Sequence, residues 1–338
     1  MSFKKLMTYC LFAMILLLGA GCGDSLESDG DSGASGNDSI TLKIAHTGSD
    51  THQYNIASEK FKELVESKSD TIKVEIHGNA TLGSEADAIE QVMDGTLEMT
   101  TVAPDSSLAN TIEEMQLFGL PFIFKDRDHV YSVLDGEIGD ELLSFVEKAN
   151  MVGLGWWEIG FRHVTNSRKE IIEPDDMEGL KIRVQPSPVW EVHMTSLGAN
   201  PTPVNFDELY SALDQGLVDG QENPLPTIDS MKFYEVQDYV ALTAHAYTPA
   251  IVVINKDLWE NRLTDEQREV IQEAVDETTG YIRTTLEEME NEIMEKLENE
   301  GVTITEPDRE KFRERTKDVP SQVDGIPEEI IERIQEEI

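Results

Sequence analysis

A long helical pattern that contains no proline occupies residues 264–300 and constrains the fold more than any other stretch of the chain. Apolar residues recur there at three- and four-residue spacing between Val270 and Leu297. At about 1.5 Å per residue such a helix is roughly 50 Å long, more than one small domain needs. We therefore expect one helix that braces two parts of the molecule. An isolated coiled coil is the alternative, but the apolar stripe is not a strict heptad.

The first third of the chain alternates strand-like and helix-like patterns. We expect strands at residues 40–45, 71–77 and 97–102 and helices at residues 54–67 and 84–94, the second beginning at a Ser84 cap. This βαβαβ order predicts a parallel, doubly wound sheet. Ligands of such sheets bind beyond the carboxyl ends of the strands, where His46 and Asp105 follow the first and third strands.

A second α/β unit begins after residue 160. Asn205 is expected to cap a helix that starts at Phe206, and residues 217–220 are expected to form a short strand. Asn223 precedes a proline, which favours an extended backbone with the amide side chain free to point into a cleft. Further strands are expected at residues 239–246 and 250–254, with a helical acidic tail that lies on the surface.

The N-terminus predicts export. Residues 1–21 combine Lys4 and Lys5 with an apolar run too short to span a membrane, and small residues precede Cys22. This arrangement is similar to a bacterial lipoprotein cleavage site, which would make Cys22 a lipidated first residue at the membrane surface. Ordinary signal cleavage that leaves a free thiol is the alternative. Residues 22–39, rich in Gly, Ser and Asp, predict a flexible tether.

Composition narrows the classes of function. The formal net charge of −40 becomes −42 once Lys4 and Lys5 leave with the signal, which excludes a nucleic-acid partner because such binding needs a basic surface. Cys10 and Cys22 are the only cysteines, so the mature chain forms no internal disulfide. We find no G-x-S-x-G, H-E-x-x-H or Walker sequence and no metal-ligand spacing, so we expect no cofactor, no metal and no enzyme.

Two arginines stand out in the stretch from residue 160 to residue 224. Arg162 and Arg183 lie in apolar, strand-like runs that are followed by Gly- and Pro-rich turns. An arginine offers a planar fork of donors that fits a carboxylate or a phosphate. The alternative is an ordinary half-exposed strand with arginine on its wet face.

The whole stretch resembles the signature region of the solute-binding proteins of TRAP (tripartite ATP-independent periplasmic) transporters, the DctP family. The matching pieces are GFRHVTN, GLKIRV, GANPTPVNFDELYSAL and VDGQENP, in that order. The resemblance implies a two-lobed clamshell like that of periplasmic binding proteins, each lobe a mostly parallel sheet flanked by helices. We expect one lobe at residues 40–159 plus about 249–287, and the other at residues 160–248 plus about 288–338.

The resemblance also implies a role for individual residues. Arg183 matches the arginine that pairs with the ligand carboxylate, and Arg162 matches a second arginine that supports it. Asn223 and Phe206 match an asparagine and an aromatic residue that contact the ligand, and the resemblance adds His46. Where some sugar-acid binders carry an acidic residue after the third strand, this chain has a proline followed by Asp105.

The function implied by the resemblance is an extracytoplasmic receptor that delivers a small organic acid to a TRAP-type permease. A C4-dicarboxylate, a hexuronate, a sialic acid and an aromatic or keto acid all remain open as ligands. A lipoprotein that senses a ligand for a signalling partner is one alternative function. An extracellular hydrolase or lyase is another.

Overall fold

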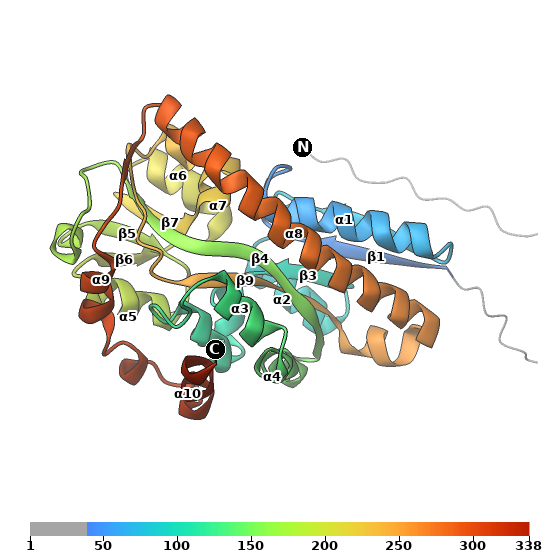
Figure 1. Ribbon diagram of the computed structural model, residues 1–338. Coiled ribbons are helices and arrows are strands. Elements are labelled where there is room, and N and C mark those ends of the chain that lie inside the picture. The colour runs from blue at the N-terminus through green and yellow to red at the C-terminus, as the bar shows by residue number, and fades with distance from the viewer. Residues whose placement is uncertain (1–38, 338) are drawn as a thin grey trace, which may run out of the picture. The chain divides into compact units, whose positions relative to one another are not determined.

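The computed structural model describes residues 39–337. The predicted signal, the Cys22 anchor and nearly all of the predicted tether lie outside this range. The described strands form one mixed sheet in the order β2-β1-β3-β9-β4-β7-β5-β6, with β8 paired to β4 and β10 to β8. Helices flank this sheet (Figure 1), and the mixed α/β fold predicted from the sequence is confirmed.

The first part of the sheet follows the predicted βαβαβ order. Its elements are β1 (Ile40–Ala45), α1 (Gln53–Lys68), β2 (Ile72–His77), α2 (Glu85–Asp94) and β3 (Met99–Val102). Strand β1 pairs in parallel with both β2 and β3, as predicted. The predicted Ser84 cap is confirmed, because its side chain accepts a hydrogen bond from the backbone N–H of Asp87 while the Asp87 carboxylate accepts one from that of Ser84.

Strand β4 (Met151–Asn166) joins the two parts of the sheet. Its first part pairs with β9 (Tyr247–Asn255) and its last residues pair with β7 (Gly220–Pro224) and β8 (Tyr239–Ala241). Register shifts occur near Gly153 and near Gly160, and the φ of Gly160 is 123°, a backbone conformation that favours glycine. Trp156 and Trp157 pack in the core on opposite faces of this strand, because adjacent strand residues point to opposite faces of a sheet.

The second part of the sheet differs from the prediction in detail. It contains β5 (Lys181–Val184), α5 (Pro188–Ser196), β6 (Asn200–Pro203), α6 (Leu209–Asp214) and α7 (Leu225–Ser230). The strand predicted at residues 217–220 is wrong, because Leu217 is 57% exposed outside the sheet and β7 begins only at Gly220. The cap predicted at Asn205 is also wrong. Its side chain makes no capping bond, and residues 206–208 form a single 3-10 turn before α6.

Helix α8 (Asp265–Asn299) is the long helix that the sequence predicts, and it begins at a reciprocal cap between Thr264 and Gln267. Its first half packs Ile271, Val275 and Ile282 into the core that lies on β1 and α1. Its second half packs on a separate core under α7. Figure 1 shows α8 running past both α1 and α7, so one helix braces two cores.

The remaining elements cover the ends of the sheet. They are α3 (Arg127–Leu134), α4 (Glu137–Ser144), β10 (Thr303–Thr305), α9 (Arg309–Thr316) and α10 (Glu328–Glu336), with a 3-10 helix at Glu113–Gly119. The strand predicted at residues 239–246 stops at Ala241, because Ala244 has a φ of 41° that leaves the extended conformation. None of the helices between residues 39 and 337 is long and apolar enough to cross a membrane.

Candidate ligand-binding site

A small cavity lies at the carboxyl ends of the parallel strands, where the βαβ pattern predicts a ligand. Twelve residues from both parts of the sheet line it: His52, Tyr54, Glu85, Ala103, Ser106, Ile159, Arg162, Arg183, Gln185, Phe206, Asn223 and Thr227. The structure therefore brings four of the predicted site residues together, Arg162, Arg183, Phe206 and Asn223. It does not place His46 or Asp105 in the lining.

Arg162 is held by a carboxylate of the protein itself. Its Nε donates to Oε2 of Glu222 over 2.5 Å, and its Nη2 donates to Oε1 of Glu222 over 3.0 Å. Burial opposes both charges, but the attraction between them keeps the pKa of Arg162 above its usual value and lowers that of Glu222 to about 2. The charge of Arg162 is therefore already compensated.

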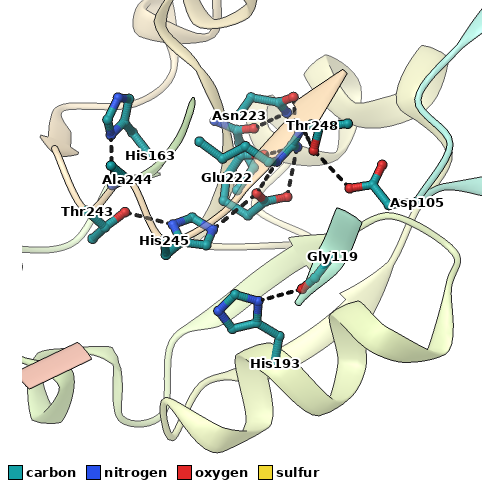
Figure 2. Close-up of polar contacts among 12 residues, drawn as sticks. Asp105, Gly119, His163, His193, Glu222, Asn223, Thr243, Ala244, His245 and Thr248 are labelled. Atoms are coloured by element: carbon teal, nitrogen blue, oxygen red, sulfur yellow. Dashed lines mark hydrogen bonds and ion pairs between the residues drawn. The ribbon is translucent and has the colours of Figure 1, made fainter. Parts of the chain in front are cut away.

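Further contacts fix the orientation of this pair. Nη2 of Arg162 also donates to Oδ1 of Asn223 over 2.9 Å, and the guanidinium lies 5.2 Å from the centre of the Trp190 ring. On the other side of Glu222, the ring of His245 lies within 3.3 Å of its Oε2 (Figure 2). Burial lowers the pKa of His245. The arginine is thus a rigid part of the cavity wall.

Arg183 differs from Arg162 in having no such partner. Its side chain is buried, its Nε donates to the backbone oxygen of Val204 over 2.8 Å, and its Nη2 has no hydrogen-bond partner. No carboxylate among residues 39–337 lies within salt-bridge distance of it. Burial lowers the pKa of Arg183 to about 10, so the group stays cationic at neutral pH. It is a buried positive charge that lines the cavity and has no ion-pair partner among the described residues.

Two carboxyl groups lie near the arginines. Glu85, the first residue of α2, lines the cavity, and burial raises its pKa to about 7. Asp105 lies outside the lining, where its Oδ2 accepts from Thr248 over 2.8 Å and burial raises its pKa to about 6 (Figure 2). Thr248 also lies 3.4 Å from Nη1 of Arg162. Asp105 therefore contacts the site only indirectly, through the hydroxyl group of Thr248.

Of the two histidines that follow β1, His52 lines the cavity and His46 does not. His46 is buried behind Tyr54, with the two ring centres 6.1 Å apart. His52 caps α1, and its Nδ1 accepts from the backbone N–H of Tyr54 over 3.1 Å. Burial lowers the pKa of His52 to about 3, so its ring is neutral and carries its proton on Nε2.

Sequence reasoning missed Glu85 and Glu222, and of the two histidines that follow β1 it favoured His46, whereas the structure places His52 in the lining. Glu85 follows the Ser84 cap directly, and the first turn of a helix after a parallel strand faces the ligand edge of the sheet, a signal that was present in the sequence. Glu222 stands in the VDGQENP segment, but its pairing with Arg162 joins residues 60 positions apart and has no local pattern. Among the described residues no group of His, Cys, Asp or Glu is placed to hold a metal ion.

Several known proteins are similar to this chain over most of its length. A 2,3-diketo-L-gulonate-binding periplasmic protein of Escherichia coli is 34% identical over 295 residues, which cover 84% of this chain and 89% of the relative. The sugar acid binding protein of Advenella mimigardefordensis, solved with galactonate, matches with a TM-score of 0.85 at 34% identity, covering 88% of this chain and 97% of its own.

A TRAP periplasmic solute-binding protein of Sulfurospirillum deleyianum, solved with succinate, matches with a TM-score of 0.83 at 30% identity, covering 89% of this chain and 100% of its own. The sequence of the chain also matches a protein family: residues 44–323 match the family model of the bacterial extracellular solute-binding proteins of family 7, called DctP. The chain therefore belongs to this family, the solute-binding proteins of TRAP transporters.

Proposed function

We propose that the protein is an extracytoplasmic receptor whose cavity captures one small organic acid through Arg183 and delivers it to a TRAP-type permease. The observation that carries this proposal is the buried guanidinium of Arg183, whose Nη2 has no hydrogen-bond partner. A carboxylate is the planar anion that a guanidinium binds with two parallel hydrogen bonds. Each such charge-assisted bond contributes about 1.5–3 kcal/mol where water is excluded.

The charges of the site favour a ligand with one carboxylate. Glu222 already neutralises Arg162, so only Arg183 needs a counter-charge. A second ligand carboxylate would meet Glu85, a carboxyl group, and His52, a neutral ring. Hydroxyl groups suit these two residues better, because a hydroxyl can donate to Glu85 and accept from His52. We therefore favour a polyhydroxy acid over a C4-dicarboxylate.

The relatives support this ligand class. One of them is named for 2,3-diketo-L-gulonate, a second is a sugar acid binding protein solved with galactonate, and a third was solved with succinate. All three are binding proteins, so we assign no catalytic role to the present cavity. Succinate is the competing ligand that the experiment below must include.

Binding measured by calorimetry tests the proposal. The protein is unfolded and refolded to remove any carried ligand and is then titrated with D-galactonate, D-galacturonate and succinate. We expect a sugar acid to bind with a one-to-one stoichiometry, and we expect Arg183→Lys to weaken binding about tenfold to a hundredfold, because lysine keeps the charge but not the planar fork. Lys181→Arg, at an exposed position of the same strand, is the matched control and should bind like the wild type.

Two outcomes would count against the proposal. If Arg183→Lys binds the ligand with unchanged affinity, the ligand carboxylate does not pair with Arg183. Tight binding of succinate with no binding of either sugar acid would show that the ligand is a dicarboxylate and not a polyhydroxy acid.

We also propose that Cys22 carries a lipid that holds the receptor at the outer side of the cytoplasmic membrane or on the periplasmic side. The small residues before Cys22 and the extracytoplasmic family support this proposal. In cell fractions, we expect the wild-type chain in the membranes and Cys22→Ser among the secreted or periplasmic proteins. A wild-type chain that leaves the membrane fraction as readily as Cys22→Ser would show ordinary signal cleavage instead.

A further inference from the structure

The charges in and around the ligand cavity are nearly balanced before any acid binds. Arg162 and Glu222 form an ion pair, so together they contribute no net charge. Arg183 contributes one positive charge, and Glu85 contributes one negative charge whenever its carboxyl group is ionised. All four side chains are buried, with at most 8% exposure, so water and salt screen their charges only weakly.

A ligand carboxylate would add a second negative charge beside Arg183. The site would then hold the anion and an ionised Glu85 against one guanidinium, and an excess of buried charge is unfavourable. Asp105, which is buried and hydrogen-bonded to Thr248, would enlarge the excess if it were ionised as well. One proton would restore the balance. Glu85 is the only carboxyl group among the described residues that line the cavity.

We propose that the receptor captures one proton together with the organic acid, and that Glu85 carries this proton in the complex. The inference rests on the proposed function, because it requires an anion to bind at Arg183. As the acid binds, a proton moves from the solvent to an oxygen of the Glu85 carboxylate, and no other bond forms or breaks. A protonated Glu85 can also donate a hydrogen bond to the ligand, which the ionised group cannot do.

The charged and titratable groups that face Glu85 come from several elements. Arg183 of β5 favours its ionised form, whereas Asp105, which follows β3, disfavours that form. Tyr54 of α1 also faces it, but burial raises the pKa of this phenol well above its usual value, so the phenol is neutral. The other such groups of the site keep a fixed charge near neutral pH, namely the neutral ring of His52 and the ion pair of Arg162 with Glu222.

The expected dependence of binding on pH follows from this environment. Burial raises the pKa of Glu85 to about 7, and Ser106 and Arg183 limit the rise. A bound carboxylate offsets the charge of Arg183 and repels an ionised Glu85, so it raises this pKa further. Below about pH 6 Glu85 is therefore protonated with or without ligand. Above pH 7 the free protein has released the proton that the complex keeps, so affinity falls as the pH rises.

Calorimetry in two buffers counts the protons that binding takes up. Tris and HEPES contain no carboxylate and differ in their heats of ionisation, so the difference between the two binding heats gives the number of protons exchanged. At about pH 8 we expect about half to one proton to be taken up per bound D-galactonate or D-galacturonate, and affinity about fivefold to tenfold weaker than at about pH 6.

Three variants identify the group that takes up the proton. Glu85→Gln resembles the protonated side chain, so at about pH 8 it should bind at least as tightly as the wild type and take up less than about 0.2 proton. Glu90→Gln, at an exposed position of the same helix, is the matched control and should take up as much as the wild type. Asp105→Asn tests the other buried carboxyl group and should retain most of the proton uptake.

Four results would overturn the proposal. They are binding without proton uptake in the wild type, full uptake in Glu85→Gln, loss of binding in Glu85→Gln, and loss of uptake in Asp105→Asn. The last would make Asp105 the acceptor, and loss of binding would mean that the ligand needs an ionised Glu85. If neither a sugar acid nor succinate binds, the proposed function fails along with this inference. If one of them binds without a proton, this inference alone fails.

Discussion

Glu85 is a carboxyl group that the fold keeps away from water at the edge of the ligand cavity. Burial raises its pKa from 4.5 to about 7, so the folded protein binds a proton there that the unfolded chain has released. The contribution of Glu85 to folding stability therefore falls as the pH rises from about 4.5 to 7. Above pH 7 the free-energy cost of burying its ionised carboxylate is fully present. This unfavourable burial is the kind of strain expected at a functional site.

We predict that Glu85→Gln removes this cost. At pH 8 the variant should be more stable than the wild type, by a difference on the order of 3 kcal/mol, and near pH 4.5 the difference should vanish. Urea unfolding of both proteins at the two pH values measures it. Glu90→Gln, at an exposed position of the same helix, is the control. A pH-independent difference for Glu85→Gln would mean that its carboxyl group titrates normally.

At the scale of elements, α3 connects β4 to α8 through charged side chains. Nε of Arg127 donates to Glu158, which is fully buried on β4, and its Nη2 pairs with Glu290 on α8. Tyr131, one turn further along α3, donates to the other oxygen of Glu158 over 2.6 Å. These contacts lie beside Gly160, where β4 changes register. They tie the strand shared by both parts of the sheet to the helix shared by both cores.

We predict that Arg127→Gln destabilises the fold by about 3 kcal/mol, because removing one member of a buried ion pair leaves the other charge uncompensated. Arg315→Gln is the matched control, since Arg315 pairs with an exposed aspartate, Asp175, at the surface. It should change stability by less than about 1 kcal/mol. Equal effects of the two substitutions in thermal unfolding would show that Glu158 does not depend on Arg127.

The sequence predicts elements where the pattern is local. The period of residues 40–102, the Ser84 cap and the proline-free run of α8 each reflect neighbours within one or two turns, and all three are confirmed. Between Pro203 and Pro224 local signals mislead. An Asn205 cap and a strand at Leu217 look plausible, but the tertiary fold uses a 3-10 turn and a strand that begins at Gly220.

The site is predicted only in part for a related reason. The resemblance of four motifs selects Arg162, Arg183, Phe206 and Asn223, and folding brings them around one cavity. Whether each contacts the ligand stays a prediction, as do the two lobes. No local pattern reveals that Glu222 pairs with Arg162 while Arg183 keeps an Nη2 without a hydrogen-bond partner, because that difference depends on side chains from distant strands.

For the whole molecule, the strongly acidic composition has a consequence for stability. With a formal charge of −40, like charges repel one another across the surface of the compact state. We predict that raising sodium chloride from about 0.05 M to about 1 M stabilises the protein by on the order of 1 kcal/mol, since the Debye length falls to about 3 Å. Urea unfolding midpoints at the two concentrations measure this, and identical midpoints would mean that the acidic groups are spread too widely to interact.

The free guanidinium of Arg183 also bears on how the receptor tells one acid from another. Formate, acetate and bicarbonate each present the same planar anion, so the common anions of any medium compete at that one point. The charge of Arg183 alone therefore does not discriminate between these carboxylate anions. Discrimination must come from the neutral and protonatable groups elsewhere in the cavity, which an acetate ion is too small to reach. An affinity measured in acetate buffer is then an apparent one, and it rises when the buffer is replaced by one without a carboxylate.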